Sequence, residues 1–198
     1  MYNRKPLHGI GINDSKVTTI MKDGSRCEAY MKWKAMVNRV YGKKALERNH
    51  NYFTTLCSQH FLTFSNFKAW YDKQVGAYEK GFELDKDLLL KGCKVYSVET
   101  CILLPKEINS FIIRRCKDRQ DKLPIGVSFH KQTRKFKAQI NVGGKRTTLG
   151  TFTNPADAFW CYKQEKQKQA KDLAEKWKDK IDVRAYEALM NYKIDIGD

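Results

Sequence analysis

The sequence predicts an α+β protein built from two small domains. From Leu84 to Asn109 the apolar segments follow the order strand, loop, strand, helix, whereas the chain after Pro124 reads as an antiparallel sheet followed by a long helix. With 198 residues, 41% of them hydrophobic, the chain is long enough for each domain to have a core.

A run of charged residues separates these two patterns. Residues 114–122, with the sequence RRCKDRQDK, contain five Lys or Arg and lack apolar periodicity, which is typical of a linker. We therefore expect an N-terminal domain over residues 1–113, a basic linker over 114–122 and a C-terminal domain over 123–198.

The N-terminal domain is expected to combine helices with a small strand region. After an extended arm over residues 1–24, apolar side chains recur at helical spacing at Tyr30, Trp33, Met36, Val37 and Val40. A second helix is expected with Ser65 as its N-cap and with Phe67, Trp70 and Tyr71 buried. Further along, a first strand is expected around Leu84, then a turn at Lys91-Gly92 followed by Val95-Tyr96, and then a second strand over residues 101–104. Pro105 suits the first position of the helix that follows, whose buried face is Ile108, Phe111 and Ile112.

The C-terminal domain is expected to be a three-stranded antiparallel sheet packed on a helix. Residues 126–129 read as a short strand, and residues 135–142 alternate with Phe136, Ala138 and Ile140 on one face. Gly143-Gly144 is a hairpin turn because glycine tolerates positive φ, and residues 145–151 return as the third strand. Asn154 and Pro155 begin a helix that runs to about Lys178, with Phe159, Tyr162, Leu173, Ala174 and Trp177 inside. A final helix is expected over residues 182–192.

The charge of the chain favours a polyanionic partner. Lys and Arg number 38 against 22 Asp and Glu, giving a formal net charge of +16. An excess of this size promotes fast, salt-sensitive association with nucleic acid. An anionic membrane would require a basic amphipathic helix or an apolar anchor, and the sequence has no apolar run of that length. We therefore expect double-stranded DNA, and not a membrane, as the partner.

The six cysteines indicate a reducing compartment. They are scattered, and none lies in a CxxC motif, so we expect reduced thiols in a cytoplasmic protein. A zinc site built from Cys57 and His60 with Cys93 or Cys101 would lack the paired ligand spacing of structural zinc sites, so zinc is not expected.

The second face of the C-terminal sheet should carry polar and basic side chains. If Phe136, Ala138 and Ile140 contact the helix, alternation along the strand points their neighbours outward. The expected outward set is Lys135, Lys137, Gln139 and Asn141, joined by Ser128 and His130 from the first strand and by Arg146 and Thr148 from the third. Lys and Arg can hold phosphates, while Gln, Asn and Arg can pair with base edges. Such a sheet can lie in the major groove.

These residues resemble the AP2/ERF DNA-binding domain. The resemblance is carried by Gly126-Val127, by residues 135–140 (KFKAQI), by residues 146–152 (RTTLGTF) and by residues 155–159 (PADAF). It implies that the sheet enters the major groove of duplex DNA. This chain has Ser128, His130, Asn141 and Thr148 where plant members have several Arg and Trp contacts, so the resemblance does not carry over a target sequence.

The segment from Leu84 to Asn109 is similar to the ββα-metal core of HNH nucleases, especially phage homing endonucleases. In that family an Asp-His pair on the first strand supplies a metal ligand and a general base, and an Asn in the helix completes the metal site. The resemblance implies that Asp85 and Asn109 hold Mg²⁺, which would stabilise charge on the scissile phosphate and the leaving oxygen. Lys86 stands at the catalytic His position, with Asp87 beside it.

Lys86 is the departure from the family pattern. Lysine is ordinarily protonated at neutral pH and then makes a poor general base, although burial can change this. His50 or His60 could lend an imidazole from elsewhere in the chain. The purely structural interpretation is that Asp85 and Asp87 cap backbone groups or form ion pairs, and that Asn109 caps or packs in its helix.

As a whole, residues 9–198 are similar to phage proteins described as HNH-like endonucleases with a C-terminal AP2 domain. Residues 62–70 (LTFSNFKAW), 84–89 (LDKDLL) and 94–109 carry this resemblance. It implies duplex binding through the sheet and metal-dependent cleavage or nicking, as in a homing endonuclease. One alternative is a catalytically inactive DNA-binding protein that acts as a regulator or inhibits a host factor. Another is a protein–protein inhibitor that uses an HNH-like scaffold, for which exposed aromatics near Tyr78 and Phe82 would be the only hint.

Overall fold

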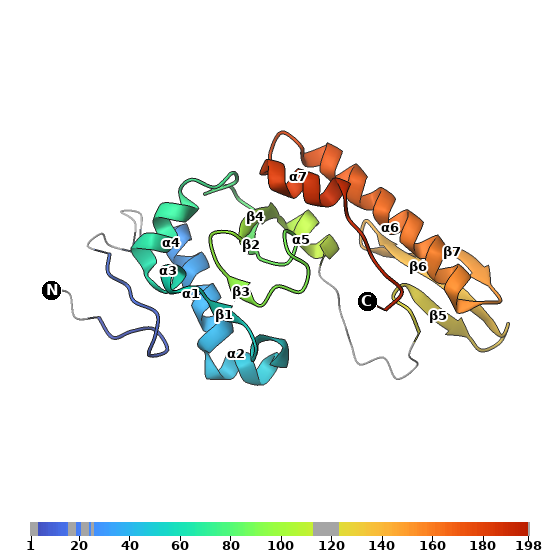
Figure 1. The fold of residues 1–198 in the computed structure, drawn as a ribbon, viewed down its shortest axis with the longest axis horizontal. Coiled ribbons are helices and arrows are strands. Elements are labelled where there is room, and N and C mark those ends of the chain that lie inside the picture. Colours follow the sequence, from blue (N-terminus) through green and yellow to red (C-terminus); the bar gives the residue numbers. More distant parts are fainter. Residues whose placement is uncertain (1–3, 16–18, 21–23, 25, 113–122, 198) are drawn as a thin grey trace. The chain divides into compact units, whose positions relative to one another are not determined.

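The computed structural model describes residues 4–15, 19–20, 24, 26–112 and 123–197 (Figure 1). Helices and strands are mixed along the chain, so the expected α+β class is confirmed. The chain divides into two compact units, one of residues 1–112 with 178–185 and the other of residues 113–177 with 186–198. The expected linker, residues 114–122, lies outside the described residues.

The helices of the first unit are short, apart from α1. Their bounds are α1 (Glu28–Tyr41), α2 (Lys43–Arg48), the 3-10 helix η1 (His50–Tyr52), α3 (Gln59–Leu62), α4 (Phe64–Tyr71) and α5 (Lys106–Ile112). On α1 the expected apolar face is confirmed, because Trp33, Met36, Val37 and Val40 are buried, while Tyr30 is half-buried.

Helix α4 begins earlier than expected. Its N-cap is Thr63, and Ser65 lies inside the first turn. The backbone N–H and the hydroxyl of Ser65 both donate to the carboxylate of Asp14, over 3.0 and 2.5 Å. The prediction that Ser65 is the N-cap is therefore wrong. The side chain of Ser65 bonds instead to Asp14, about fifty residues earlier, and such a contact cannot be inferred from the local sequence pattern. The predicted burial of Phe67, Trp70 and Tyr71 is confirmed.

An aromatic cluster forms the core of the first unit. The ring of Phe61 lies 4.9 Å from Trp70 and 5.2 Å from Phe67, and Trp33 lies 5.5 Å from Phe64, measured between centroids. Trp33 also donates from Nε1 to the carbonyl of Phe61 over 2.9 Å, so its buried N–H is paired. These contacts join α1 to α3 and α4.

Two short strand pairs complete this unit. β1 (Leu56–Cys57) runs parallel to β3 (Val95–Tyr96), and β2 (Phe82–Asp85) runs antiparallel to β4 (Ile102–Pro105). The expected order of strand, loop, strand and helix is present, with α5 directly after β4. Pro105 closes β4 and α5 begins one residue later, so the prediction that Pro105 is the first helical residue is wrong by one position.

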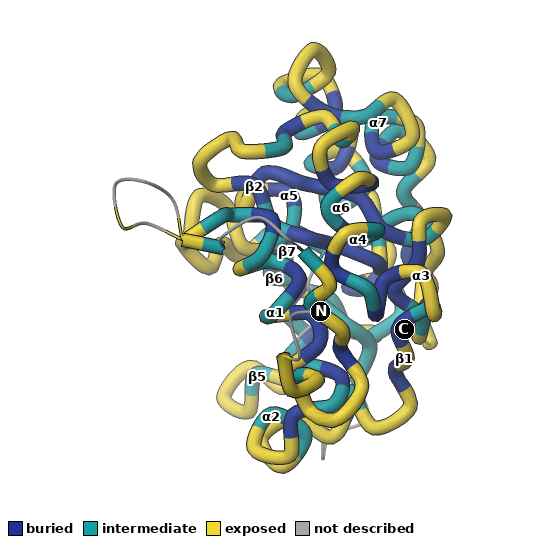
Figure 2. The backbone as a smooth tube through the Cα atoms, turned by 90° about the vertical axis from the view of Figure 1, so that its left-hand side faces the viewer, coloured by how far each residue is buried: buried dark blue, intermediate teal, exposed yellow. Residues whose placement is uncertain are grey.

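The second unit is a three-stranded antiparallel sheet covered by a helix. Its elements are β5 (Val127–His130), β6 (Lys135–Val142), β7 (Lys145–Phe152) and α6 (Pro155–Trp177). The division between the units falls within α7 (Val183–Met190), whose residues from Tyr186 onward are assigned to this unit. β6 is the central strand. In β6 the buried Ala138 and Ile140 alternate with more exposed neighbours. Figure 2 colours the whole backbone by burial.

Helix α6 covers one face of the sheet (Figure 1). The buried cluster between them contains Val127, Ala138, Ile140, Ala158, Phe159, Tyr162 and Ile194. The predicted inner face of α6 is confirmed at Phe159, Tyr162 and Ala174, whereas Leu173 and Trp177 are only half-buried. Within the described part of the chain, no helix combines the length and apolarity that a bilayer crossing requires.

Candidate nucleic-acid interface

The strand register assigns side chains to the two faces of the sheet. Residues opposite one another in a ladder share a face. In β5 and β6, Ser128 pairs with Lys137 and His130 with Lys135. In β6 and β7, Gln139 pairs with Thr148 and Asn141 with Arg146. The structure therefore brings all eight predicted DNA-contacting residues onto one surface, here named the open face.

The opposite face of the sheet packs in the core. Phe136, Ala138 and Ile140 alternate with the open-face residues of β6, and Ala138 and Ile140 are buried against α6. Phe152 pairs with Phe136 and packs on the same cluster. Because α6 takes this side, the polar side is the one that remains available to a ligand.

An irregularity in β7 makes this arrangement possible. Ala138 pairs with Gly150 but the next residue, Gln139, pairs with Thr148, so Leu149 is an extra residue in β7. Such a bulge reverses the alternation of side chains beyond it. Without it, Thr148 and Phe152 would share a face, and one of them would point to the wrong side. Leu149 instead packs against the core cluster.

Hydrogen bonds connect the three strands across the open face. Ser128 Oγ donates to Gln139 Oε1 over 2.9 Å, and Gln139 Nε2 donates to Thr148 Oγ1 over 3.3 Å. The central glutamine is thus held from both sides. At one end of the face, His130 Nδ1 and Thr133 Oγ1 are 2.9 Å apart.

The segment that forms the sheet is uniformly basic. Residues 123–156 contain six Lys or Arg and neither Asp nor Glu. Lys135, Asn141, Arg146 and Thr148 are exposed, while the other predicted contacts are half-buried. The register also adds Thr151, which pairs with Lys137 and is exposed. Sequence reasoning missed Thr151 because strict alternation from Arg146 and Thr148 assigns it to the helix side.

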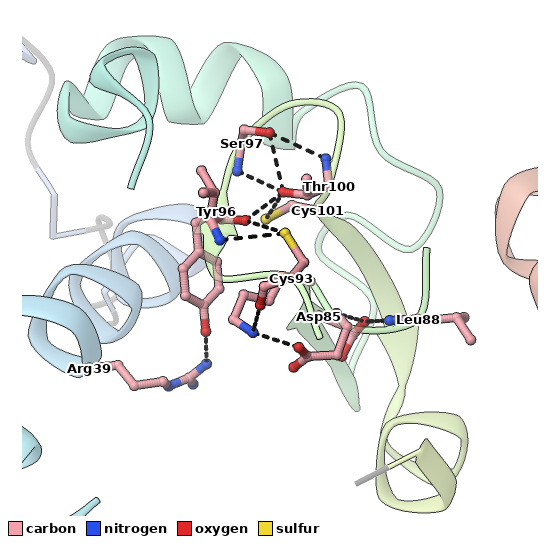
Figure 3. A network of polar contacts seen from close by, with 11 residues as sticks. Arg39, Asp85, Leu88, Cys93, Tyr96, Ser97, Thr100 and Cys101 are labelled. Atoms are coloured by element: carbon pink, nitrogen blue, oxygen red, sulfur yellow. Dashed lines mark hydrogen bonds and ion pairs between the residues drawn. The ribbon is translucent and has the colours of Figure 1, made fainter. Parts of the chain in front are cut away.

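Asp85, predicted as a metal ligand, is buried at the end of β2. Its Oδ2 accepts the backbone N–H groups of Asp87 and Leu88, both over 2.8 Å (Figure 3). Burial raises the pKa of Asp85 to about 6, and the neighbouring Asp87 acts in the same direction, against the hydrogen bonds and Lys86. A carboxyl group that titrates near neutrality is suited to proton transfer as well as to backbone capping.

Lys86 holds the loop that follows β2. Its side chain is buried, and Nζ donates to Asp87 Oδ1 over 2.6 Å and to the Cys93 carbonyl over 2.7 Å. The ammonium lies 5.7 Å from the centroid of the Tyr96 ring. The Nζ group thus bonds to two separate parts of the loop, Asp87 at its start and Cys93 near its end. In this arrangement Lys86 joins these two parts of the loop.

Asn109, the other predicted metal ligand, lies on α5 and donates from Nδ2 to Glu83 Oε2. Asp85 and Asn109 therefore have different hydrogen-bonding partners. Glu83 was missed by sequence reasoning, although its spacing of two from Asp85 on a strand is a signal that could have found it. Among the described residues, no group of three or more His, Cys, Asp or Glu is placed to hold a metal ion.

The two candidate imidazoles lie against aromatic rings. His50 stacks on Phe53 with centroids 5.2 Å apart, and His60 lies 6.3 Å from Phe61. Both histidines are exposed. A residue that the sequence did not indicate is Arg39 of α1, whose Nη1 donates to the Tyr96 hydroxyl over 3.0 Å (Figure 3).

Tyr78 and Phe82, around which the inhibitor alternative expected exposed aromatics, differ in exposure. Tyr78 is 49% exposed, but Phe82 is 4% exposed because it packs in β2. The cation of Lys68 and the carboxylate of Asp72 both contact the Tyr78 hydroxyl, over 3.3 and 2.5 Å. Phe82 therefore cannot contribute to a docking surface.

Comparisons with protein-family models, with curated proteins and with solved structures gave no match for this chain. A function is accordingly inferred from the geometry of the described residues.

Proposed function

We propose that this protein binds duplex DNA through the open face of its C-terminal sheet. The observation that carries the proposal is the strand register, which gathers cationic, amide and hydroxyl side chains on one face while α6 covers the other. Lys and Arg at the margins can neutralise phosphates, and amide groups between them can pair with base edges. Sheets and ribbons of this kind can enter the major groove.

Duplex DNA fits this face better than duplex RNA does. The face is one side of a three-stranded sheet, and an element of this kind can enter the wide major groove of B-form DNA. The major groove of A-form RNA is deep and narrow, and side chains cannot read its base edges. Binding should therefore favour B-form DNA over an RNA duplex of the same sequence.

Salt dependence tests the interface directly. Fluorescence anisotropy with a labelled duplex should give an affinity that falls linearly on a log–log scale as NaCl increases. Lys137→Ala and Arg146→Ala should each weaken binding and reduce the slope by about 0.9 for each phosphate contact removed. Lys171→Ala is the matched control, because it removes an exposed cation from α6, on the other side of the sheet.

Unchanged affinity and slope in both open-face variants would show that this face is not the interface. A loss equal to that of Lys171→Ala would point to net charge alone. Equal affinity for the RNA duplex would contradict binding in the major groove of B-form DNA.

A second candidate function is metal-dependent endonuclease activity of the HNH type, as in phage homing endonucleases. The observation that favours it is the order β2, loop, β4 and α5, with the buried carboxyl group of Asp85 on the strand and Asn109 on the helix. Asp85 and Asn109 would hold Mg²⁺, with Glu83 bonded to Asn109, and the ion would stabilise charge on the scissile phosphate. The fit is partial: the buried Lys86 is engaged in structural contacts where the family has a base.

Cleavage is tested with supercoiled plasmid, Mg²⁺ or Mn²⁺, and the variants Asp85→Ala, Asn109→Ala and Glu83→Gln. Nicking by the wild type that is lost in the first two variants supports this candidate. Nicking that survives both substitutions would overturn the site assignment. Duplex binding without nicking under either metal would leave the inactive DNA-binding protein, a regulator or an inhibitor of a host factor.

A further inference from the structure

We propose that Gln139 recognises an adenine in the major groove and that Ser128 and Thr148 position its amide for that contact. This inference rests on the proposed duplex binding and adds to it the identity of one base. It changes the role of Ser128 and Thr148, which the sequence suggested as DNA contacts, to that of residues acting through Gln139.

The position of Gln139 is central on the open face. It lies on β6, the middle strand, and its pairing partner on β7 is Thr148. Ser128 on β5 reaches it diagonally, from a position opposite Lys137. The bulge at Leu149 is what turns Thr148 to this side. Three strands thus contribute one side chain each to the same hydrogen-bonded row.

The two cross-strand hydrogen bonds leave one donor and one acceptor on the amide. Gln139 Oε1 accepts from Ser128 Oγ, and Gln139 Nε2 donates to Thr148 Oγ1. An amide has two N–H groups and two oxygen lone pairs. One of each therefore remains. The two hydroxyls flank the amide from neighbouring strands, and the adenine contact would use the donor and acceptor that they leave.

This remaining pair matches adenine. In the major groove adenine presents an acceptor at N7 beside a donor at N6, whereas guanine presents two acceptors. An amide that offers one donor and one acceptor together can bond to both adenine groups but to only one of guanine's. The match does not depend on which way the amide is turned, because each hydroxyl can donate or accept.

Holding the amide in advance strengthens the discrimination. A free glutamine side chain loses rotamer freedom when it binds a base, and bracing by two neighbours removes part of that cost beforehand. It also fixes where the amide edge points, so that a mismatched base meets an unpaired donor or acceptor. Replacing the recognised base pair should therefore weaken binding by roughly 5- to 150-fold.

The experiment begins with selection of bound sequences from a randomised duplex library. The wild-type protein should enrich sites with a fixed A·T pair, and Gln139→Ala should lose the preference at that pair alone. In the enriched duplex, replacing the adenine with 7-deazaadenine removes N7 and should weaken wild-type binding roughly fivefold, as expected for one hydrogen bond. The same replacement should have little effect on Gln139→Ala.

Variants of the two hydroxyl residues test positioning. Thr148→Val and Ser128→Ala should reduce discrimination at the A·T pair while leaving the salt slope unchanged, and Thr148→Ser should restore it. Asn141→Ala is the control for an amide on the same strand and face. It should leave discrimination at this pair intact.

The outcomes separate this inference from the proposed function. A wild-type protein that binds no duplex would overturn duplex binding and this inference with it. Salt-dependent binding without any base preference, or an identical enriched site for Gln139→Ala, would overturn the adenine contact alone. Full discrimination in Thr148→Val and Ser128→Ala together would overturn the positioning role.

Discussion

At the scale of single residues, the buried carboxyl group of Asp85 should make the stability of the fold depend on pH. Burial raises its pKa to about 6 in the folded protein, from 3.8 in an exposed group. The folded state therefore binds this proton more tightly than the unfolded state. The contribution of Asp85 favours folding most at low pH, and it declines as the pH rises from about 4 to about 6. The difference between a pKa of 3.8 and one of about 6 corresponds to about 3 kcal/mol in the free energy of unfolding across this pH range.

Asp85→Asn should remove this dependence. The amide oxygen of Asn can still accept the N–H groups of Asp87 and Leu88, but it carries no buried charge. We expect the free energy of unfolding of the variant to equal or exceed that of the wild type at pH 7, and to change less between pH 4 and 6. Denaturant titration at several pH values measures this. A wild type that gains stability from pH 4 to 6 relative to the variant would contradict a raised pKa.

Lys86 stands at a motif position, and its side chain bonds to the loop that follows β2. From the sequence it stands where the resemblance places a catalytic base, whereas the structure shows its amine bonded to Asp87 and the Cys93 carbonyl. The sequence could not reveal this because the Cys93 contact depends on the path of the loop over residues 87–92. The adjacent aspartate was visible, but its ion pair with Lys86 requires a particular rotamer.

At the scale of elements, the approach of β5 to α6 depends on glycine. Gly126 precedes β5 with φ of 78°, and a Cβ atom there would lie 2.2 Å from the ring of Tyr162 on α6. Positive φ already disfavours other residues, and the ring leaves no room for a methyl group. The sequence showed the Gly126-Val127 pair as the start of a strand and as part of the AP2-like resemblance. The structure adds that this glycine allows the close packing of sheet and helix.

Two glycine substitutions separate strain from steric conflict. Gly126→Ala should destabilise the second unit by more than the roughly 1 kcal/mol expected for a positive φ alone. Gly143→Ala is the matched control, because Gly143 has φ of 56° but no atom within 4 Å of a built Cβ. Differential thermal unfolding of the two variants measures the difference. Equal destabilisation would show that Tyr162 moves aside without cost.

The bulge in β7 determines which side chains of that strand lie on the open face. The eight predicted contacts were assigned correctly to one face, although simple alternation would have put Phe152 on that face too. The extra residue, Leu149, resolves the conflict by reversing the alternation between Thr148 and Gly150. A bulge is hard to predict from the sequence of its own strand. It depends on which residues of that strand must face the core on each side of the extra residue.

At the scale of the whole molecule, the cysteines differ in burial and should therefore differ in reactivity. Cys57 and Cys101 are buried, and burial raises the pKa of each to about 12. At pH 8 only roughly one in ten thousand of such thiols is ionised, and the thiolate is the reactive form. Cys27 and Cys161 are partly exposed and free. Cys116 lies outside the described residues.

Alkylation of the native protein at pH 8 should therefore modify Cys27 and Cys161 well before Cys57 and Cys101. Peptide mass spectrometry after timed iodoacetamide exposure measures the order, and the same reaction in guanidinium provides the unfolded control, in which the thiols should react at similar rates. Early modification of Cys101 in native protein would show that the core of the first unit opens readily.

The sequence by itself determined the class, the main elements and the composition of the open face. Apolar periodicity located α1 and α6, and strict alternation with a Gly-Gly turn located β6 and β7, because these signals depend on neighbours within one element. Charge alone pointed to a polyanion. These properties are local or additive, so they can be read along the chain.

Only the tertiary structure decided how particular side chains are used. It paired Ser65 with Asp14, Asn109 with Glu83 and Lys86 with Cys93. It also braced Gln139 between Ser128 and Thr148. In each case a polar group takes the partner that folding brings within hydrogen-bonding distance, and several of these partners are far away in sequence. The physical reason is that buried or crowded polar groups must be satisfied, and the partner depends on how the elements pack.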